Sequence, residues 1–159
     1  MAISAASIKY YQSTVWEVED DTEGGVIDLL HEITTATDKN IFDDTTDAER
    51  VAGNVEYRKI FIRNENADTW ESVLAWIEAQ TPATNSVVAI NCNNATADDV
   101  QLAAKAYNYF EPNSKIHADV QTIGNLVQDA SHAIWIRRTI TAAGDGYTDD
   151  TFEVKCESS

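Results

Sequence analysis

The sequence has few cysteines and few basic residues, and each shortage excludes a class of protein. Among its 159 residues are only two cysteines, Cys92 and Cys156, which are too few for a disulfide scaffold. We expect both thiols to be free and reduced. A disulfide between them is the alternative if their strands are neighbours. The 11 basic residues are outnumbered by 27 acidic ones, so the net charge is −16. Because such a surface repels nucleic acid and anionic lipid, we expect neither as a partner.

Long apolar segments are also missing. The longest runs, residues 86–90 and 133–136, fall far short of a membrane span. Residues 1–4 lack the basic and apolar regions of a signal peptide, so we expect the chain to be made and kept in a cytosol, or released by lysis. Hydrophobic residues make up 43% of the chain. That share, with this length, predicts one folded domain over residues 1–159.

Short segments rich in β-branched and aromatic residues predict strands separated by turns. Residues 55–63 form the clearest strand, in which Arg58 shares one face with Ile60 and Ile62. The other expected strands are 7–11, 25–33, 41–42, 73–79, 87–92, 133–141 and 151–156. Eight short strands with few helices predict an all-β sandwich or barrel.

One short helical insertion is expected among the strands, at residues 97–109. Thr96 precedes Asp98 and Asp99, which is typical of a helix N-terminus, and Pro112 follows the segment. Residues 110–132 then form a long polar connection, with a short strand expected at 116–120. Between the last two strands, the Asp145-Gly146 pair predicts a hairpin.

No motif in the sequence indicates catalysis or a cofactor. His31, His117 and His132 are isolated from other zinc ligands, and neither a nucleophile elbow nor a phosphate-binding loop is present. A glycosidase stays open only because 27 acids offer many carboxylate pairs. The acidic run Asp43–Asp47 offers oxygen ligands of the kind that calcium prefers, and calcium binding stays open for that reason. The run lacks the regular spacing of a calcium loop, so it does not predict such a site. We therefore expect no enzyme, no cofactor and no metal.

Basic residues are concentrated in two short segments, 58–63 and 137–138. An arginine on an apolar strand face has to pair with an acid or reach the strand end. Two interpretations stand: pairing within the chain, or a basic patch that docks on an acidic partner or a second subunit. Residues 1–8 are small and apolar, and form either an arm that adds to a neighbour's sheet or an edge strand of their own sandwich. The candidate interface residues are Arg58, Lys59, Arg63, Arg137, Arg138, Ile3 and Ile8.

Two of the four tryptophans are candidates for surface contacts. Trp16 and Trp70 lie beside acidic, loop-like sequence, whereas Trp135 begins an apolar strand and is expected in the core. An exposed tryptophan on a sandwich can stack on a sugar ring. Trp16 and Trp70 therefore favour, as an alternative function, a module that binds glycans or a host surface.

The segment Asp43–Asn66, which reads DDTTDAERVAGNVEYRKIFIRNEN, carries a resemblance. Its pattern of Thr-x-Ala-Glu-Arg, then Gly, then Tyr-Arg-Lys-Ile-Phe-Ile-Arg-Asn resembles a group of uncharacterised tailed-phage and prophage proteins encoded among virion structural genes. The likeness extends over residues 24–156 in outline, through Trp70 with the strand at 73–77, the Thr81-Pro82-Ala83 turn, and residues 133–138 with Asp150-Thr151-Phe152. It is specific at residues 48–64.

The resemblance implies a virion component with an immunoglobulin-like β-sandwich, assembled in the host cytoplasm, and it carries no catalytic residues. We expect the protein to decorate or stabilise a capsid through contacts with the major capsid protein or other virion proteins. A head–tail connector or a tail component is an alternative, and a homo-oligomer stays open.

Overall fold

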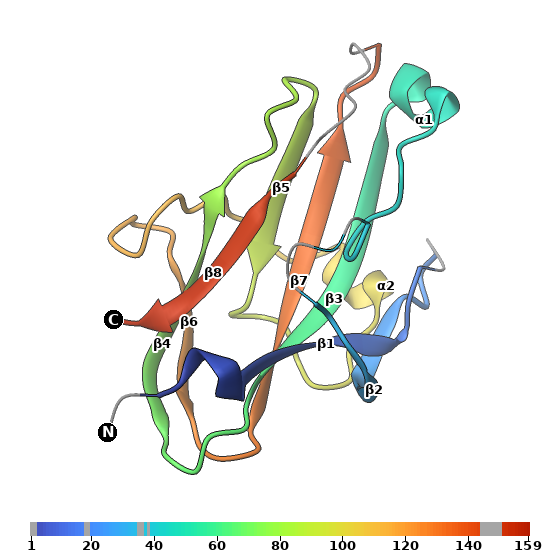
Figure 1. Cartoon of the computed structure of the whole chain (residues 1–159). Coiled ribbons are helices and arrows are strands. Elements are labelled where there is room, and N and C mark those ends of the chain that lie inside the picture. Colours follow the sequence, from blue (N-terminus) through green and yellow to red (C-terminus); the bar gives the residue numbers. More distant parts are fainter. Residues whose placement is uncertain (1–2, 18–19, 35–36, 38, 144–150) are drawn as a thin grey trace.

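In the part of the chain that the structure describes, eight strands form two antiparallel sheets that pack face to face (Figure 1). The computed structural model describes residues 3–17, 20–34, 37, 39–143 and 151–159. The strands are β1 (Ile8–Val15), β2 (Gly24–Glu32), β3 (Asn54–Asn64), β4 (Trp70–Ala79), β5 (Ser86–Asn91), β6 (Gln121–Leu126), β7 (Ser131–Ile140) and β8 (Glu153–Ser158). The short helices are η1 (Ala5–Ser7), α1 (Asp47–Ala52) and α2 (Gln101–Ala104). The predicted all-β class is therefore confirmed, and a two-sheet sandwich is plausible.

The larger sheet has the strand order β2-β1-β3-β7-β5, and the smaller has the order β6-β4-β8. Strands β3 and β7 make the longest pairing, from Asn54 opposite Ile140 to Arg63 opposite Ser131. Each sheet leaves two edge strands, which are β2 and β5 in the larger sheet and β6 and β8 in the smaller. Isolated bridges of Gly24 with Val100 and of Ile90 with Phe110 cover part of β2 and of β5. Among the described residues, no strand pairs with the remaining backbone groups of these edges.

The main core lies between the two sheets. Alternate residues of β3 and β7 point inward, so that Ile60, Ile62, Ile134 and Ile136 pack against the smaller sheet. Val73, Ala75 and Ile77 supply the facing side chains from β4. This alternation is what the sequence of residues 55–63 predicts.

The opposite face of the larger sheet is covered by the segment 92–110. Trp135, Tyr57 and Ala104 form a second cluster there, with Tyr107 and Tyr109 packed on it. The expected helix over 97–109 is only the four residues of α2. The aspartates expected at its N-terminus lie before it, and Asp99 instead turns its carboxylate toward Lys59 of the sheet.

Several local expectations are corrected by the structure. Residues 41–42 form no strand; Phe42 is a buried loop residue. Helix α1 was not expected, and the expected strand at 116–120 lies instead at 121–126 as β6. The last two strands form no hairpin, because β7 belongs to the larger sheet and β8 to the smaller. The Asp145-Gly146 pair itself lies outside the described residues.

Candidate functional site: a groove and a sheet edge

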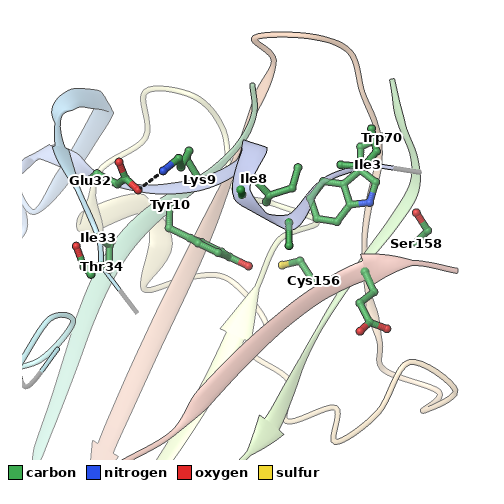
Figure 2. A pocket seen from close by; sticks show the side chains of 13 residues that line it. Ile3, Ile8, Lys9, Tyr10, Glu32, Ile33, Thr34, Trp70, Cys156 and Ser158 are labelled. Carbon is green, nitrogen blue, oxygen red and sulfur yellow. Dashed lines mark hydrogen bonds and ion pairs between the residues drawn. The ribbon is translucent and has the colours of Figure 1, made fainter. Parts of the chain in front are cut away.

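A groove opens where the N-terminal segment crosses the edge of the smaller sheet (Figure 2). Its volume is about 670 Å³, and its walls come from residues 3–10, the end of β2, Trp70 and β8. Ile3, Ile8 and Tyr10 pack against the main core and form its apolar side. Among the described strands, β8 pairs with β4 alone, and its residues Cys156, Glu157 and Ser158 line the groove. The groove therefore combines apolar side chains with an open strand edge.

Polar groups of the groove lie at its rim. Lys9 Nζ contacts Glu32 Oε1 at 2.8 Å in an exposed ion pair, which Figure 2 shows. The carboxylate of Glu32 raises the pKa of Lys9 by accepting this hydrogen bond and by its charge. Because the pair is exposed, it orients two side chains at the rim and adds little stability.

The cysteine in the groove is not an activated nucleophile. Burial raises the pKa of Cys156 to about 12, against a smaller opposing effect of the Tyr10 hydroxyl, which points toward it in Figure 2. Burial likewise raises the pKa of Cys92 well above its usual value. Both thiols are free, as expected. At neutral pH both stay protonated, and a protonated thiol is a poor nucleophile and a poor metal ligand.

The two candidate tryptophans are less exposed than the sequence suggests. Trp70 begins β4, is only 7% exposed and contributes its ring to the wall of the groove. Trp16 is half-buried against the main core, where the Arg58 guanidinium lies 6.0 Å from its ring centroid. Their predicted role in surface contacts stays a prediction.

The basic candidates all have partners inside the chain. Arg58, Lys59 and Arg138 are buried, with exposed fractions of 0%, 0% and 9%. The half-buried Arg63 donates to the backbone oxygen and a carboxylate oxygen of Asp129 at 2.7 and 2.8 Å. Arg137 lies 4.7 Å from the ring centroid of Tyr109. This placement gives the five cations internal contacts, and an interface role of Arg63 and Arg137 stays a prediction.

Two of these arginines flank one aromatic ring at the end of the main core. The guanidiniums of Arg58 and Arg138 lie 5.5 and 4.6 Å from the ring centroid of Phe42. Arg138 also forms a buried ion pair with Glu56 and donates to the backbone oxygen of Asp43. Cation–π contacts of this kind stabilise a buried guanidinium by about 1 kcal/mol each.

Lys59 lies on the other face of the larger sheet, beneath the segment 92–110. Its Nζ donates to the backbone oxygens of Gly25 and Asp99 at 2.7 and 3.0 Å, and lies 2.5 Å from Asp99 Oδ1. Burial lowers the pKa of Lys59, although Asp99 opposes this effect. For Asp99, burial acts to raise the pKa, but hydrogen bonds from Lys59 and Tyr107 outweigh it, so the pKa is lowered.

The N-terminal candidates Ile3 and Ile8 are half-buried in their own chain. Ile8 begins β1 and both side chains pack against the main core, with η1 between them. Ser7 also accepts a backbone hydrogen bond from Glu65. In this structure, residues 3–8 therefore belong to their own sandwich; whether they also reach a neighbour stays a prediction.

Exposed apolar side chains gather on the edge strand β2, a feature that the sequence analysis did not single out. Val26, Leu29 and Leu30 are 49%, 53% and 90% exposed. In the larger sheet β2 pairs with β1, and Gly24 also forms a bridge with Val100. Leu29 and Leu30 lie where the pairing with β1 is irregular, between Ile27 opposite Ser13 and Glu32 opposite Tyr11. We call β2 with these three side chains the β2 edge. The apolar run Val-Ile-Asp-Leu-Leu was readable in the sequence, but its position at an edge was not.

Within the described residues no three His, Cys, Asp or Glu side chains cluster as metal ligands would, and neither α-helix is long and apolar enough to cross a membrane. Comparison with protein-family models, with curated proteins and with solved structures gives no match for this chain.

Proposed function

We propose that the protein is a virion structural protein that decorates or stabilises a phage capsid by binding other virion proteins. The observation that carries the proposal is the β2 edge, where Leu30 is 90% exposed on an edge strand of the larger sheet. An exposed apolar edge is a hazard that soluble proteins normally avoid, unless a partner covers it. The resemblance of residues 43–66 to virion proteins supplies the kind of partner.

The surface charge supports the same proposal. With a net charge of −16, free copies repel one another before assembly, which limits pairing between their edges. A neighbouring virion protein that adds a strand to β2 would cover unpaired backbone groups, and contacts with the protruding side chain of Leu30 would bury apolar surface. The net negative charge of the chain then favours a partner strand with basic flanks.

We further propose that the sandwich is a variant of the immunoglobulin fold. The order β1-β3-β7-β5 follows the order A-B-E-D of the immunoglobulin sheet, if β2 is counted as an addition. The smaller sheet differs, because β6 precedes β7 in the chain and β4 lies at the centre. An experimental structure in which β4 lies at an edge of its sheet would support the standard topology over this variant.

Particles of the phage that encodes the chain, assembled with and without it, test the proposed function. Particles that contain the protein are expected to release their DNA at a higher temperature than particles that lack it, and added protein should restore the difference. Identical release temperatures, together with no protein pelleting with the particles, would reject the virion role.

A further inference from the structure

The buried pair of Lys59 and Asp99 is the strongest candidate for chemistry elsewhere in the molecule. The two residues are 40 positions apart and join β3 to the segment that covers the outer face of the sheet. We propose that they condense into an intramolecular isopeptide bond between Lys59 Nζ and Asp99 Cγ, with the release of one water molecule. This inference does not depend on the proposed virion role.

The two reacting groups already lie in contact. Lys59 Nζ is 2.5 Å from Asp99 Oδ1, and the two side chains are 0% and 6% exposed. Among the described residues, no donor other than the Lys59 ammonium reaches Oδ1. The lysine also donates to the backbone oxygens of Gly25 and Asp99. Holding an amine against a carboxyl group in this way replaces a collision in solution with a reaction within one site.

The second carboxylate oxygen of Asp99, Oδ2, accepts hydrogen bonds from three donors that can stabilise negative charge during the reaction. Oδ2 accepts hydrogen bonds from the Tyr107 hydroxyl at 2.8 Å and from Trp135 Nε1 at 3.1 Å. The backbone N–H of Thr96 adds a third at 3.2 Å. When an amine attacks Cγ, negative charge builds up on this oxygen, and fixed donors stabilise such charge in a dry site. Oδ1, which lacks these donors, is therefore the leaving oxygen.

The step balances without an external reagent. The lysine ammonium transfers one proton to Oδ1 and becomes a neutral amine, whose nitrogen lone pair forms the bond to Cγ. A second proton then passes from nitrogen to Oδ1, the Cγ–Oδ1 bond breaks, and Oδ1 leaves as water. The amide nitrogen keeps one hydrogen. One ammonium and one carboxylate are thereby replaced by a neutral amide and water, with no net change of charge.

The surroundings favour the neutral product over the ion pair. Lys59 Nζ lies 5.1 Å from the ring centroid of Phe61 and 5.8 Å from that of Trp135. The enclosure is tight, since a Cβ built on Gly24 would lie 2.8 Å from the Trp135 ring and 2.9 Å from the Asp99 backbone oxygen. Charges are costly in such a site, and replacing a buried ion pair by neutral groups is often stabilising. Burial also lowers the pKa of Lys59, which raises the share of reactive amine.

Mass spectrometry of the intact, denatured full-length chain tests the proposal. The wild type is compared with Lys59→Arg, whose guanidinium keeps the charge but is not a nucleophile. The substitution alone adds about 28 Da, and an isopeptide bond in the wild type adds the mass of one water to the difference, giving about 46 Da. Comparing two variants with the same N-terminus cancels any processing of that end.

Lys9→Arg is the matched control, because Lys9 forms an exposed ion pair with Glu32 at 2.8 Å. It should differ from the wild type by about 28 Da only. Proteolysis of the wild type should also yield one branched peptide that contains residues 59 and 99. A difference of about 28 Da for both variants, with residues 59 and 99 always in separate peptides, would overturn the proposal and leave an ion pair.

Discussion

Arg58 and Lys59 are neighbours in β3 and both are fully buried, but they lie on opposite faces of the larger sheet. Arg58 points into the main core beside Phe42, at the end where Asp43 connects the site to solvent. Lys59 points to the outer face, where the segment 92–110 encloses it with Asp99. One strand thus buries two cations by two different arrangements.

The difference shows how a cation is accommodated where water reaches it and where water does not. At the arginine end, two guanidiniums share the ring of Phe42 and the exposed carboxylate of Asp43. At the lysine, the polar contacts in the described structure come from the backbone oxygens of Gly25 and Asp99 and from the Asp99 carboxylate. Removing an interaction partner should therefore lower the free energy of unfolding more at Lys59 than at the arginine end, because water cannot take the place of the missing partner at Lys59.

The largest effect is expected for Lys59→Met, which removes the lysine and leaves the carboxylate of Asp99 enclosed. We expect the free energy of unfolding to fall by about 4 kcal/mol, as when one partner of a buried pair is removed. Denaturant unfolding followed by tryptophan fluorescence measures it. The double variant Lys59→Met, Asp99→Asn leaves no unpaired charge, so it should be more stable than the single variant. Equal stability of the two would contradict the enclosed-charge account.

At the arginine end, Phe42→Ala removes the ring that both guanidiniums share, and the expected loss is about 3 kcal/mol. Phe42→Leu is the matched control, because it keeps most of the apolar volume without the ring. A loss of about 2 kcal/mol is expected for the leucine variant, about 1 kcal/mol for each of the two missing cation–π contacts. If the leucine variant is as unstable as the alanine variant, packing shape rather than the ring's charge distribution supports the arginines.

The smallest effect is expected at α1, which follows Asp43 and ends near the arginine site. Thr46 accepts a hydrogen bond from the Glu49 N–H, and Glu49 Oε2 accepts one from the Thr46 N–H at 2.7 Å. Thr46→Ala should reduce the free energy of unfolding by about 1 kcal/mol, the usual value for a lost N-cap.

The pH dependence of this cap has a definite sign. Hydrogen bonds from the backbone and side chain of Thr46 lower the pKa of Glu49 below its usual 4.5. Because the pKa of Glu49 is lower in the folded state, its hydrogen bonds stabilise the fold fully above pH 4.5. This stabilisation is lost as the pH falls through the folded-state pKa. The protection factor of the Thr46 amide, which allows for the slower intrinsic exchange in acid, should fall in that range, and Glu49→Gln should remove this dependence. An unchanged exchange profile in the glutamine variant would contradict the assignment.

Much of the larger sheet was predictable from sequence, because its strands alternate in a simple way. The alternation in residues 55–63 placed Arg58 on the face of Ile60 and Ile62, as the structure confirms. Helix α1 was also readable, since Thr46 and Glu49 have the spacing of a capping box. It was missed because the acidic run before it indicated only a turn.

The candidate sites were not predictable, because they depend on contacts between distant parts of the chain. Asp99 has the sequence context of a helix N-terminus, but its carboxylate pairs with Lys59 across 40 positions. The hairpin expected between β7 and β8 failed because the chain changes sheets there. The groove likewise joins residues 3–10 to residues 156–158. Local patterns carry no information about which remote segment covers a given strand.

Binding of the purified protein to particles that lack it tests the central claim most directly. Leu30→Lys places a charge on the β2 edge, and Ile116→Lys is the control at a residue with the same exposed fraction, 90%, outside the edge. We predict that the Leu30 variant binds at least about tenfold more weakly, a loss of about 1.4 kcal/mol, while the Ile116 variant binds like the wild type. Equal binding by all three proteins would contradict docking through the β2 edge.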